Sequence, residues 1–532
     1  MIRRPPRSTL SSSSAASDVY KRQDWYSDID RALTYRYFNS LKNFKYPSII
    51  YEKNSDSTLT SSIYLTPKER FSLGLDMDIS HSNIQNIGMG FGLSTGIRNI
   101  FKGTEILNFG IKNTLGASRN SADTNDRFFN IFELGGDIKI RFPKIISPFS
   151  LEKLIAKDMD PSTQITFGTT LQENIGLDKQ YFGTTFEYEW RTSNNRRFIF
   201  KLIDLEFVNN KNIENYFNVY RNSYDRLNII AINNDLSENY FDEDNNLKIP
   251  LGTNLFIKNV ENGSLSTLSN EEELKLKSIS ERRNRLTVNN LILGSSLSFN
   301  YNNQESILDQ NFYQFRWKFE WVGNILNKFL DLTSQKNING NYEINGVTPS
   351  QYLKTDIDFI RHLPLGRDRV FAFRFFSGVA LPVGNSENIP FSRSYFAGGA
   401  NDNRAWKAYK LCPGTSENNN EFNEANLKIS INMEYRFPVI GSLKGALFVD
   451  SGNIWNFQDN ITDPKASFDK LSDLSEIAIG SGIGIRYDFD FFVFRFDTGF
   501  KTFNPSLENN KRWLSDFSVR QGVFNIGINY PF

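Results

Sequence analysis

Long segments in which apolar and polar residues alternate at every second position most constrain the fold of this chain. In Asn426–Phe437, Leu, Ile, Met, Tyr and Phe share one face, and Asn, Lys, Ser, Glu and Arg share the other. Ile477–Phe489 repeats the pattern, with small or charged residues opposite Ile, Tyr and Phe. Such segments run about ten to thirteen residues, whereas soluble strands have a mode of about five to six. A tilted transmembrane strand needs about nine to eleven residues, so the length favours strands that cross a membrane.

Sixteen segments of this kind follow residue 68, an even number, as in bacterial single-chain barrels. If the chain starts on the periplasmic side, the links after odd-numbered segments are extracellular and should be the longer ones. Five such links are long, but the link 143–161, after segment 4, is long on the expected periplasmic side. The five are 210–285, 323–349, 382–425, 457–476 and 502–520. The segments begin near Glu69, Gln85, Thr104, Arg127, Thr163, Tyr181, Arg197, Leu286, Gln310, Ser350, Asp368, Asn426, Lys444, Ile477, Phe492 and Gln521.

The apolar outer face determines how such a sheet must end. Unpaired backbone groups cost several kcal/mol each in lipid, so the first and last strands are expected to pair. The sequence therefore predicts an all-β fold, a sixteen-stranded antiparallel transmembrane β-barrel over 68–532. Aromatic residues make up 14% of the chain, as expected for lipid-facing positions and interfacial girdles. On the fifteenth segment Phe492, Phe494 and Phe496 are expected to face lipid, and Arg495 and Asp497 the lumen. No uncharged apolar run approaches eighteen residues, which excludes a transmembrane helix.

The first 67 residues differ from the rest. Residues 1–23 are basic and Ser-rich, lack the apolar stretch of a signal peptide, and resemble the translation of a sequencing adapter. We predict that they are non-native and disordered, and that native sequence starts near Asp24. Asp24–Phe44 has helical periodicity, which Pro47 is expected to end. Short strand patterns follow at Ser48–Glu52 and Leu59–Leu65, which gives a small α+β unit over 24–67.

Composition excludes several function classes. A net charge of +1 with 23% charged residues argues against a nucleic-acid binder. The single cysteine, Cys412, excludes an intramolecular disulfide and a cysteine-based zinc cluster. The two histidines, His81 and His362, are isolated, so neither a histidine metal site nor a Ser/His enzyme is expected. We predict no catalytic residue, no metal and no cofactor.

Two motifs have ordinary structural interpretations. The Gly-x-Gly-x-Gly patterns at 88–92 and 480–484 are similar to phosphate-binding loops, but they lie within strands rather than between a strand and a helix. We interpret these glycines as small lumen-facing residues that let another segment pack closely. The acidic run at 242–245 lacks the glycine and the glutamate of an EF-hand loop. A solvated loop is favoured there over a calcium site.

The segment Arg393–Gly414 is the most informative of the long links. It contains Gly398 and Gly399, then Arg404-Ala405-Trp406, then Pro413-Gly414. Paired glycines and Pro-Gly set tight turns, which an exposed loop does not require. The pattern is typical of a loop that folds back into the lumen with Arg404 at its tip.

A buried guanidinium needs carboxylate partners, and the next two strands supply them. Glu434 and Asp450 lie on the polar, inward face by alternation. Phe448 is also inward and is suited to stack on the guanidinium of Arg404. The alternative is an ordinary extracellular loop with unrelated lumen charges.

Four motifs together resemble the BamA/TamA family of outer-membrane assembly barrels, the bacterial surface antigen family. They are FAGG…NRAW…PG, NMEYRFP, LFVDSGNIW and the C-terminal GVFNIGINYPF. The resemblance implies a sixteen-stranded barrel preceded by POTRA domains, with 24–67 as the C-terminal part of the last one. It places the family's loop arginine on Arg404, its glutamate partner on Glu434, and its Phe-x-Asp on Phe448 and Asp450. Ala405 and Cys412 replace glycines expected there, which favours a TamA-like branch.

The resemblance implies a function without covalent chemistry, the insertion or export of client proteins at the bacterial outer membrane. The implied route is the seam between the first strand, about 69–82, and the last, about 521–532. The last strand contains Phe524. Its Gly522 and Gly527 are expected to weaken its packing, and its Pro531 removes one hydrogen-bond donor near its end. Terminal Phe532 is expected to help the barrel itself to be recognised for assembly.

The implied partners are outer-membrane lipid, unfolded β-barrel clients, and periplasmic or lipoprotein accessory subunits, without nucleic acid. Two alternatives stay open at this point. One is a two-partner-secretion-type transporter with a single substrate, and the other is a passive outer-membrane pore.

Overall fold

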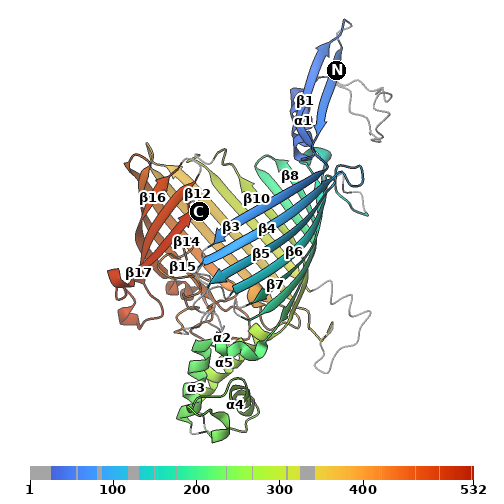
Figure 1. Cartoon of the computed structure of the whole chain (residues 1–532). Coiled ribbons are helices and arrows are strands. Elements are labelled where there is room, and N and C mark those ends of the chain that lie inside the picture. Colours follow the sequence, from blue (N-terminus) through green and yellow to red (C-terminus); the bar gives the residue numbers. More distant parts are fainter. Residues whose placement is uncertain are drawn as a thin grey trace.

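The structure is a computed structural model of the chain, and Figure 1 shows one large curved sheet with smaller units at its two ends. The predicted adapter-like segment 1–23 and His81 lie outside the described residues. The residues that the structure describes are 26–55, 58–80, 87–117, 131–148, 151, 154–173, 177–234, 236–265, 268–306, 309–323, 342–344, 346–417, 420, 422–461, 463–489, 492–528 and 530–532.

The large sheet has sixteen strands, and each pairs antiparallel with its neighbours in the sequence, from β3 to β18. This confirms the predicted fold class, and every predicted start lies within four residues of an observed one. The strands are β3 (Phe71–Ser80), β4 (Ile87–Arg98), β5 (Ile106–Ala117), β6 (Ile131–Phe142), β7 (Ser162–Glu173), β8 (Lys179–Ser193), β9 (Arg196–Asn210), β10 (Asn290–Asn302), β11 (Tyr313–Val322), β12 (Tyr352–Pro364), β13 (Val370–Pro382), β14 (Leu427–Ile440), β15 (Leu443–Trp455), β16 (Ala478–Asp488), β17 (Val493–Phe503) and β18 (Val523–Ile528).

The expected closure between the first and last strands is wrong for the described residues. β3 and β18 end the sheet on opposite sides and share no ladder. β18 is six residues long, not the predicted twelve, and it pairs with Phe494–Gly499 of β17 alone. The chain beyond it contacts the inner face of the sheet, because the ring of Tyr530 lies 4.0 Å from the guanidinium carbon of Arg436.

Alternation sets the two faces of the sheet. On β15, Leu447 is 51% exposed and Val449 38%, whereas Phe448 and Asp450, each the next residue along the strand, are buried. On β17, Phe494 and Phe496 are exposed as predicted. Phe492 lies before that strand and stacks on Phe489 with ring centroids 4.6 Å apart, so its predicted place in the strand is wrong.

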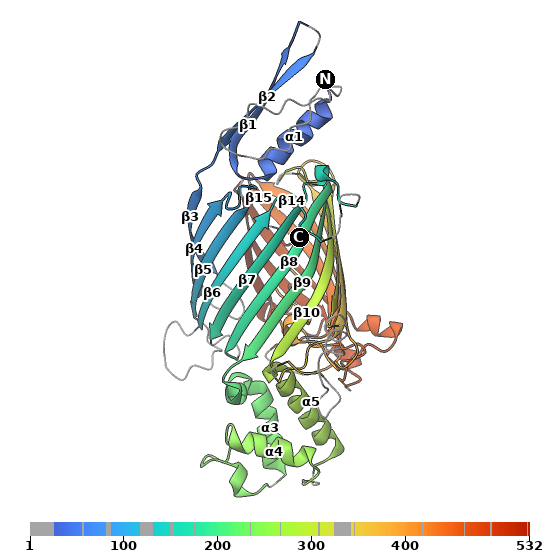
Figure 2. The ribbon, with the colours of Figure 1, turned by 90° about the vertical axis from the view of Figure 1, so that its right-hand side faces the viewer.

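The link between β9 and β10 is a helical insertion rather than a simple loop, and it projects from the end of the sheet opposite the N-terminal unit (Figure 2). Its core includes Leu227, Phe256 and Leu276, each 0% exposed. None of the helices in the described part of the chain is both long and apolar enough to cross a membrane. The elements of the insertion are η2 (Ile213–Asn215), α2 (Tyr216–Val219), α3 (Arg221–Asn233), η3 (Glu238–Tyr240), α4 (Leu251–Glu261) and α5 (Asn270–Thr287).

This insertion is fixed to the link between β13 and β14. Arg282 donates to the main-chain oxygen of Phe422 at 2.6 Å, and Arg285 forms an ion pair with Glu424 at 2.7 Å. Burial lowers the pKa of Arg285, but Glu424 and Glu281 outweigh burial and raise that pKa above its ordinary value. The helical insertion therefore holds the outer part of the same link that carries Arg404.

The N-terminal unit consists of α1 (Asp28–Ser40), β1 (Phe44–Lys53) and β2 (Leu59–Pro67). The helix is shorter than predicted, because Lys42 adopts a left-handed φ of 57° and starts the turn into β1. Phe44, expected on the helix, begins β1 and packs edge-on against Phe38. Pro47 lies in a bulge of β1 rather than at the helix end, a position where its missing N–H is tolerated.

The unusually long link 143–161 forms the contact site for this N-terminal unit, which we call the seat. Its residues 157–159 form the short helix η1 (Lys157–Met159). Arg36 of α1 forms an ion pair with Asp160 at 3.3 Å and donates to the main-chain oxygen of Asp158 and to Asn194. The link is itself anchored, because Tyr188 of β8 donates to the oxygen of Ile146 at 2.8 Å.

We expect Arg36→Ala to loosen this seat while leaving the sheet intact. Exposed ion pairs contribute about 0.2–1 kcal/mol, so the change should widen the angular range of the unit rather than unfold it. Pulsed electron paramagnetic resonance between nitroxides at Lys53 and Arg367 should show a broader distance distribution. Lys45→Ala, at an exposed position of β1, is the control and should leave the distribution unchanged. Equal widths for both variants would contradict the assignment of the seat.

Candidate functional site: a loop fixed inside the sheet

The link between β13 and β14 turns back against the inner face of the sheet, and its turns need glycine. Gly398 and Gly399 have φ values of 93° and 102°, a region that other residues rarely adopt. The N–H of Gly398 donates to Asp402 at 2.7 Å, and that of Gly399 to the oxygen of Trp406 at 2.8 Å. These bonds close a compact turn that presents Arg404 at its tip.

Arg404 is 1% exposed and is held on three sides. Its Nε and one terminal nitrogen bind the two oxygens of Asp450 at 2.8 and 2.9 Å. The other terminal nitrogen binds Glu434 at 2.5 Å. The ring of Phe448 lies 3.5 Å from the guanidinium carbon. The structure thus brings together the four residues that the sequence grouped around the loop tip.

The network is larger than the sequence indicated. Glu434 also binds Arg436 at 2.8 Å and Arg486 at 3.0 Å. Asp497 of β17 binds Arg486 at 2.5 Å and lies 3.6 Å from Arg404. Arg495 binds Asp497 at 3.2 Å. Four guanidiniums and three carboxylates therefore share one buried cluster, drawn from the loop and from β14 to β17.

Inward glycines make room for this loop. A Cβ on Gly480 would lie 2.5 Å from the Cβ of Ala405, and one on Gly499 would lie 2.5 Å from the main-chain oxygen of Arg404. A Cβ on Gly482 would meet the ring of Phe448 at 2.3 Å. These contacts explain the second Gly-x-Gly-x-Gly pattern by close packing. In the first pattern, Gly90 makes room for the side chain of Asp78 on the neighbouring strand.

The rest of the loop motif also packs tightly. Trp406 is buried, and its ring lies 5.6 Å from the ammonium of Lys501. Gly414 has a φ of 55°, and its N–H donates to the oxygen of Ile454 at 2.8 Å. The oxygen of Pro413 accepts a bond from Ser416 at 2.6 Å. The loop is therefore fixed at both its tip and its base.

The last strand contacts the loop tip directly. Asn525 of β18 donates to the main-chain oxygen of Arg404 at 2.9 Å. Gly527 lies where a Cβ would meet Arg495 at 2.4 Å, so it makes room for that side chain. Phe524 is 64% exposed on the outer face and stacks on Phe496, while Gly522 directly precedes the strand.

The end of the chain lies against the inner face of β12 and β14. Phe532 accepts a bond through its main-chain oxygen from Arg436 at 3.5 Å, and His362 lies 3.1 Å from the same oxygen. Since Arg436 also binds Glu434, one side chain connects the loop cluster to the chain end. The sequence placed Phe532 in the last strand, and its expected role in assembly stays a prediction.

The described residues offer this site no reactive group. Glu434, Asp450 and Asp497 are each paired with at least one guanidinium. Burial raises the pKa of the Cys412 thiol, which disfavours the nucleophilic thiolate. Asp242 of the acidic run accepts main-chain bonds from Asp244 and Asn246. No group of metal-binding side chains occurs within the described ranges. The described side chains of this site hold a loop in a fixed position against the sheet.

Comparisons with known proteins agree with this fold. A family model for the Omp85 superfamily domain matches residues 172–532. The crystal structure of BamA from Haemophilus ducreyi lacking POTRA domains 1-3 is similar, with a TM-score of 0.53 at 12% identity, over 90% of this chain and 76% of that chain. CdiB from Acinetobacter baumannii and CdiB from Escherichia coli each match with a TM-score of 0.40 at 10% identity. The matches cover 92% and 87% of this chain and 66% and 65% of the CdiB chains. No curated protein matches.

The family model covers more than half of the chain, and the sixteen-stranded sheet agrees with the BamA fold. The resemblance drawn from the loop and strand motifs is confirmed at this level. Proteins of this family are bacterial outer-membrane transporters and assembly factors that act on unfolded outer-membrane proteins. This chain belongs to the Omp85 superfamily.

Proposed function

We propose that this protein inserts client β-barrel proteins into the outer membrane through the gap between β3 and β18. The observation that carries the proposal is the pair of unpaired edges, because β3 and β18 end the same sheet without a shared ladder. An exposed edge offers main-chain donors and acceptors to an incoming strand, which is recognition by β-augmentation. In this proposal 68–532 forms the membrane domain and 24–67 the end of the last POTRA domain.

The loop cluster supports this function by holding the last strand from inside. Only six residues of β18 pair with β17, so this strand has few ladder bonds. Asn525 adds a bond to the loop tip, and Arg495 donates to the main-chain oxygen of Ala400 in the same loop at 2.8 Å. We propose that the loop keeps β18 in place while its outer edge stays available to a client.

Site-specific photocrosslinking tests the route. A photoreactive phenylalanine replaces Leu75 on β3 or Ile526 on β18, both exposed, and the protein in liposomes receives a urea-denatured β-barrel client. We expect crosslinks from both edge positions. The matched control is Ile138, an exposed position on β6, a strand that is paired on both sides, and it should give none. Equal yields from all three positions would contradict a route through the gap.

The same experiment separates insertion from export. Lys139 follows Ile138 on β6 and faces the inner side of the sheet by alternation, where it pairs with Asp137. Crosslinks from Lys139 without crosslinks from the edges would indicate passage through the interior, as in a two-partner-secretion-type transporter. An absence of crosslinks at every position, with a steady conductance, would indicate a passive pore.

A further inference from the structure

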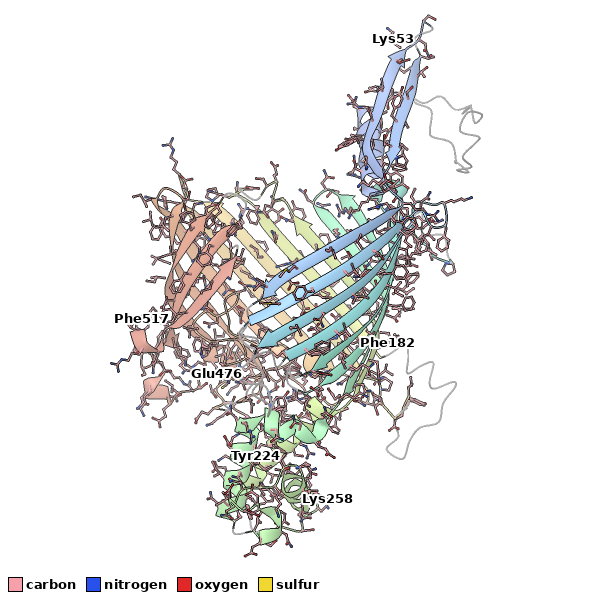
Figure 3. The ribbon with its side chains drawn as sticks, viewed as in Figure 1. Lys53, Phe182, Tyr224, Lys258, Glu476 and Phe517 are labelled. Atoms are coloured by element: carbon pink, nitrogen blue, oxygen red, sulfur yellow. The ribbon has the colours of Figure 1, made fainter. Side chains whose placement is uncertain are left out.

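The link between β17 and β18, residues 504–522, leaves the sheet beside the unpaired edge of β18, and we call it the rim segment. It begins as an extension of β17, since the N–H of Asn504 donates to the oxygen of Arg512 and that of Leu514 to the oxygen of Thr502, both at 2.9 Å. Figure 3 shows Phe517 on this segment, to the side of the sheet and away from its interior. The rim segment therefore extends outward, whereas the link between β13 and β14 folds inward.

The rim segment packs on the lipid-facing side of β17. The ring of Phe517 packs at a tilt of 38° against that of Phe500, with centroids 5.1 Å apart. Phe500 shares its face with the exposed Phe494 and Phe496 by alternation. Phe517 therefore contacts β17 on the side of the sheet that faces lipid.

Four large apolar side chains of the rim segment are exposed to solvent in the isolated chain. The exposed fractions are 61% for Trp513, 58% for Leu514, 47% for Phe517 and 82% for Val519. They continue the exposed apolar face of β18, on which Phe524, Ile526 and Ile528 are 62–68% exposed. Exposed apolar side chains grouped in this way mark an interaction site, and Phe517 joins them to the lipid-facing side of β17 through Phe500.

Several polar side chains of the same segment are bonded within it, and Asp516 also lies 3.9 Å from Lys501 of β17. Asp516 accepts from Asn504 at 2.7 Å, and Lys511 forms an ion pair with Glu508 at 2.8 Å. Arg512 donates to the main-chain oxygen of Leu507 at 3.0 Å. Lys511 and Glu508 are themselves exposed, so the outer surface of the segment combines charged and apolar side chains. Tryptophan and other aromatic residues favour the boundary between acyl chains and headgroups.

We propose that the rim segment inserts Trp513, Leu514, Phe517 and Val519 into the lipid of the adjacent leaflet, next to the gap between β3 and β18. The occupant of this apolar surface is lipid, because the surface is continuous with the band that already faces lipid. The inference rests on the membrane setting of the sheet and not on client insertion. It gives β18 a second anchor, in the bilayer, besides the loop inside the sheet.

Depth measurement by electron paramagnetic resonance tests this proposal on the full chain in liposomes. In a Cys412→Ser background, a single nitroxide is placed at Val519→Cys. We expect collisions with oxygen, which concentrates in lipid, to exceed collisions with a water-soluble nickel chelate several-fold. Ile526→Cys on the outer face of β18 is the lipid reference. Lys258→Cys is the water reference, since Figure 3 shows Lys258 on the helical insertion, far from the sheet.

The outcome does not depend on client insertion. A ratio at position 519 that matches position 526 supports the inference even if the protein inserts no client. A ratio that matches position 258 overturns it, and so does one that is unchanged when the liposomes are replaced by a polymer that excludes lipid. Val519 is 82% exposed, so replacing it by cysteine removes little packing and is not expected to cause misfolding.

Discussion

Arg404→Ala is expected to destabilise the sheet more than any other single substitution in the loop. Asp450 has Arg404 as its cationic partner among the described contacts and is 0% exposed, so the substitution leaves a buried carboxylate without a counter-charge. Removing one partner of a buried pair costs about 3–5 kcal/mol. We expect a clear fall in the temperature at which the purified protein loses its compact, faster-migrating band on gels run with and without heating.

Two controls define this result. Arg404→Lys keeps the charge but loses the two-pronged contact with Asp450, so it should lie between wild type and alanine. Arg367→Ala removes an exposed arginine from the turn between β12 and β13 and should have no effect. A midpoint for Arg404→Ala within error of Arg367→Ala would show that the cluster does not stabilise the sheet.

Gly499→Val is expected to displace the loop tip from β17. A Cβ at this position would lie 2.5 Å from the main-chain oxygen of Arg404 and 2.8 Å from the nitrogen of Ala405, and main chain cannot move aside as a flexible side chain can. Overpacking of this kind costs about 1–3 kcal/mol. Since Lys407 and Lys410 follow the tip and are exposed, we expect trypsin to cut at them faster in the variant.

The matched substitution is Gly136→Val on β6. A Cβ there has ordinary spacing, with the oxygen of Gly110 at 3.8 Å as its near neighbour. Both variants place a β-branched residue in a strand of the same sheet, but Gly136 shares the outer face with Ile138 and lies away from the loop. Equal rates of cleavage in the two variants would contradict the role of Gly499 as the seat of the loop tip.

The sequence predicted the strands well because a membrane sheet imposes a strict period of two. The same alternation placed Glu434, Phe448 and Asp450 on the inner face. Alternation does not tell which inward charges on the neighbouring strands β14 to β17 meet one another, so it does not predict that Arg486 and Asp497 join the cluster. The last strand was predicted too long, since the pattern continues to Phe532 while contacts with Arg436 and His362 hold that end inside.

The helical insertion was also missed, although its sequence carries a signal. On α3, Leu227, Ile230 and Ala231 recur at helical spacing and are buried, and Ser269 with Glu272 forms a capping box at the start of α5. The rule that extracellular links are long does not distinguish a loop from a helical insertion. The contact between Arg36 and the link 143–161 could likewise not be predicted, because no local sequence pattern indicates that this link meets α1.

The shared use of Glu434 by three arginines has a consequence for how this protein can change over evolutionary time. A substitution at Arg404, Arg436 or Arg486 alters the partners of the others, so the effects of such changes are not additive. Replacing a whole buried ion pair by apolar residues is often neutral, whereas losing one member is severe. Substitutions in this cluster should therefore be accepted together. We expect these positions to vary in a correlated way across related sequences.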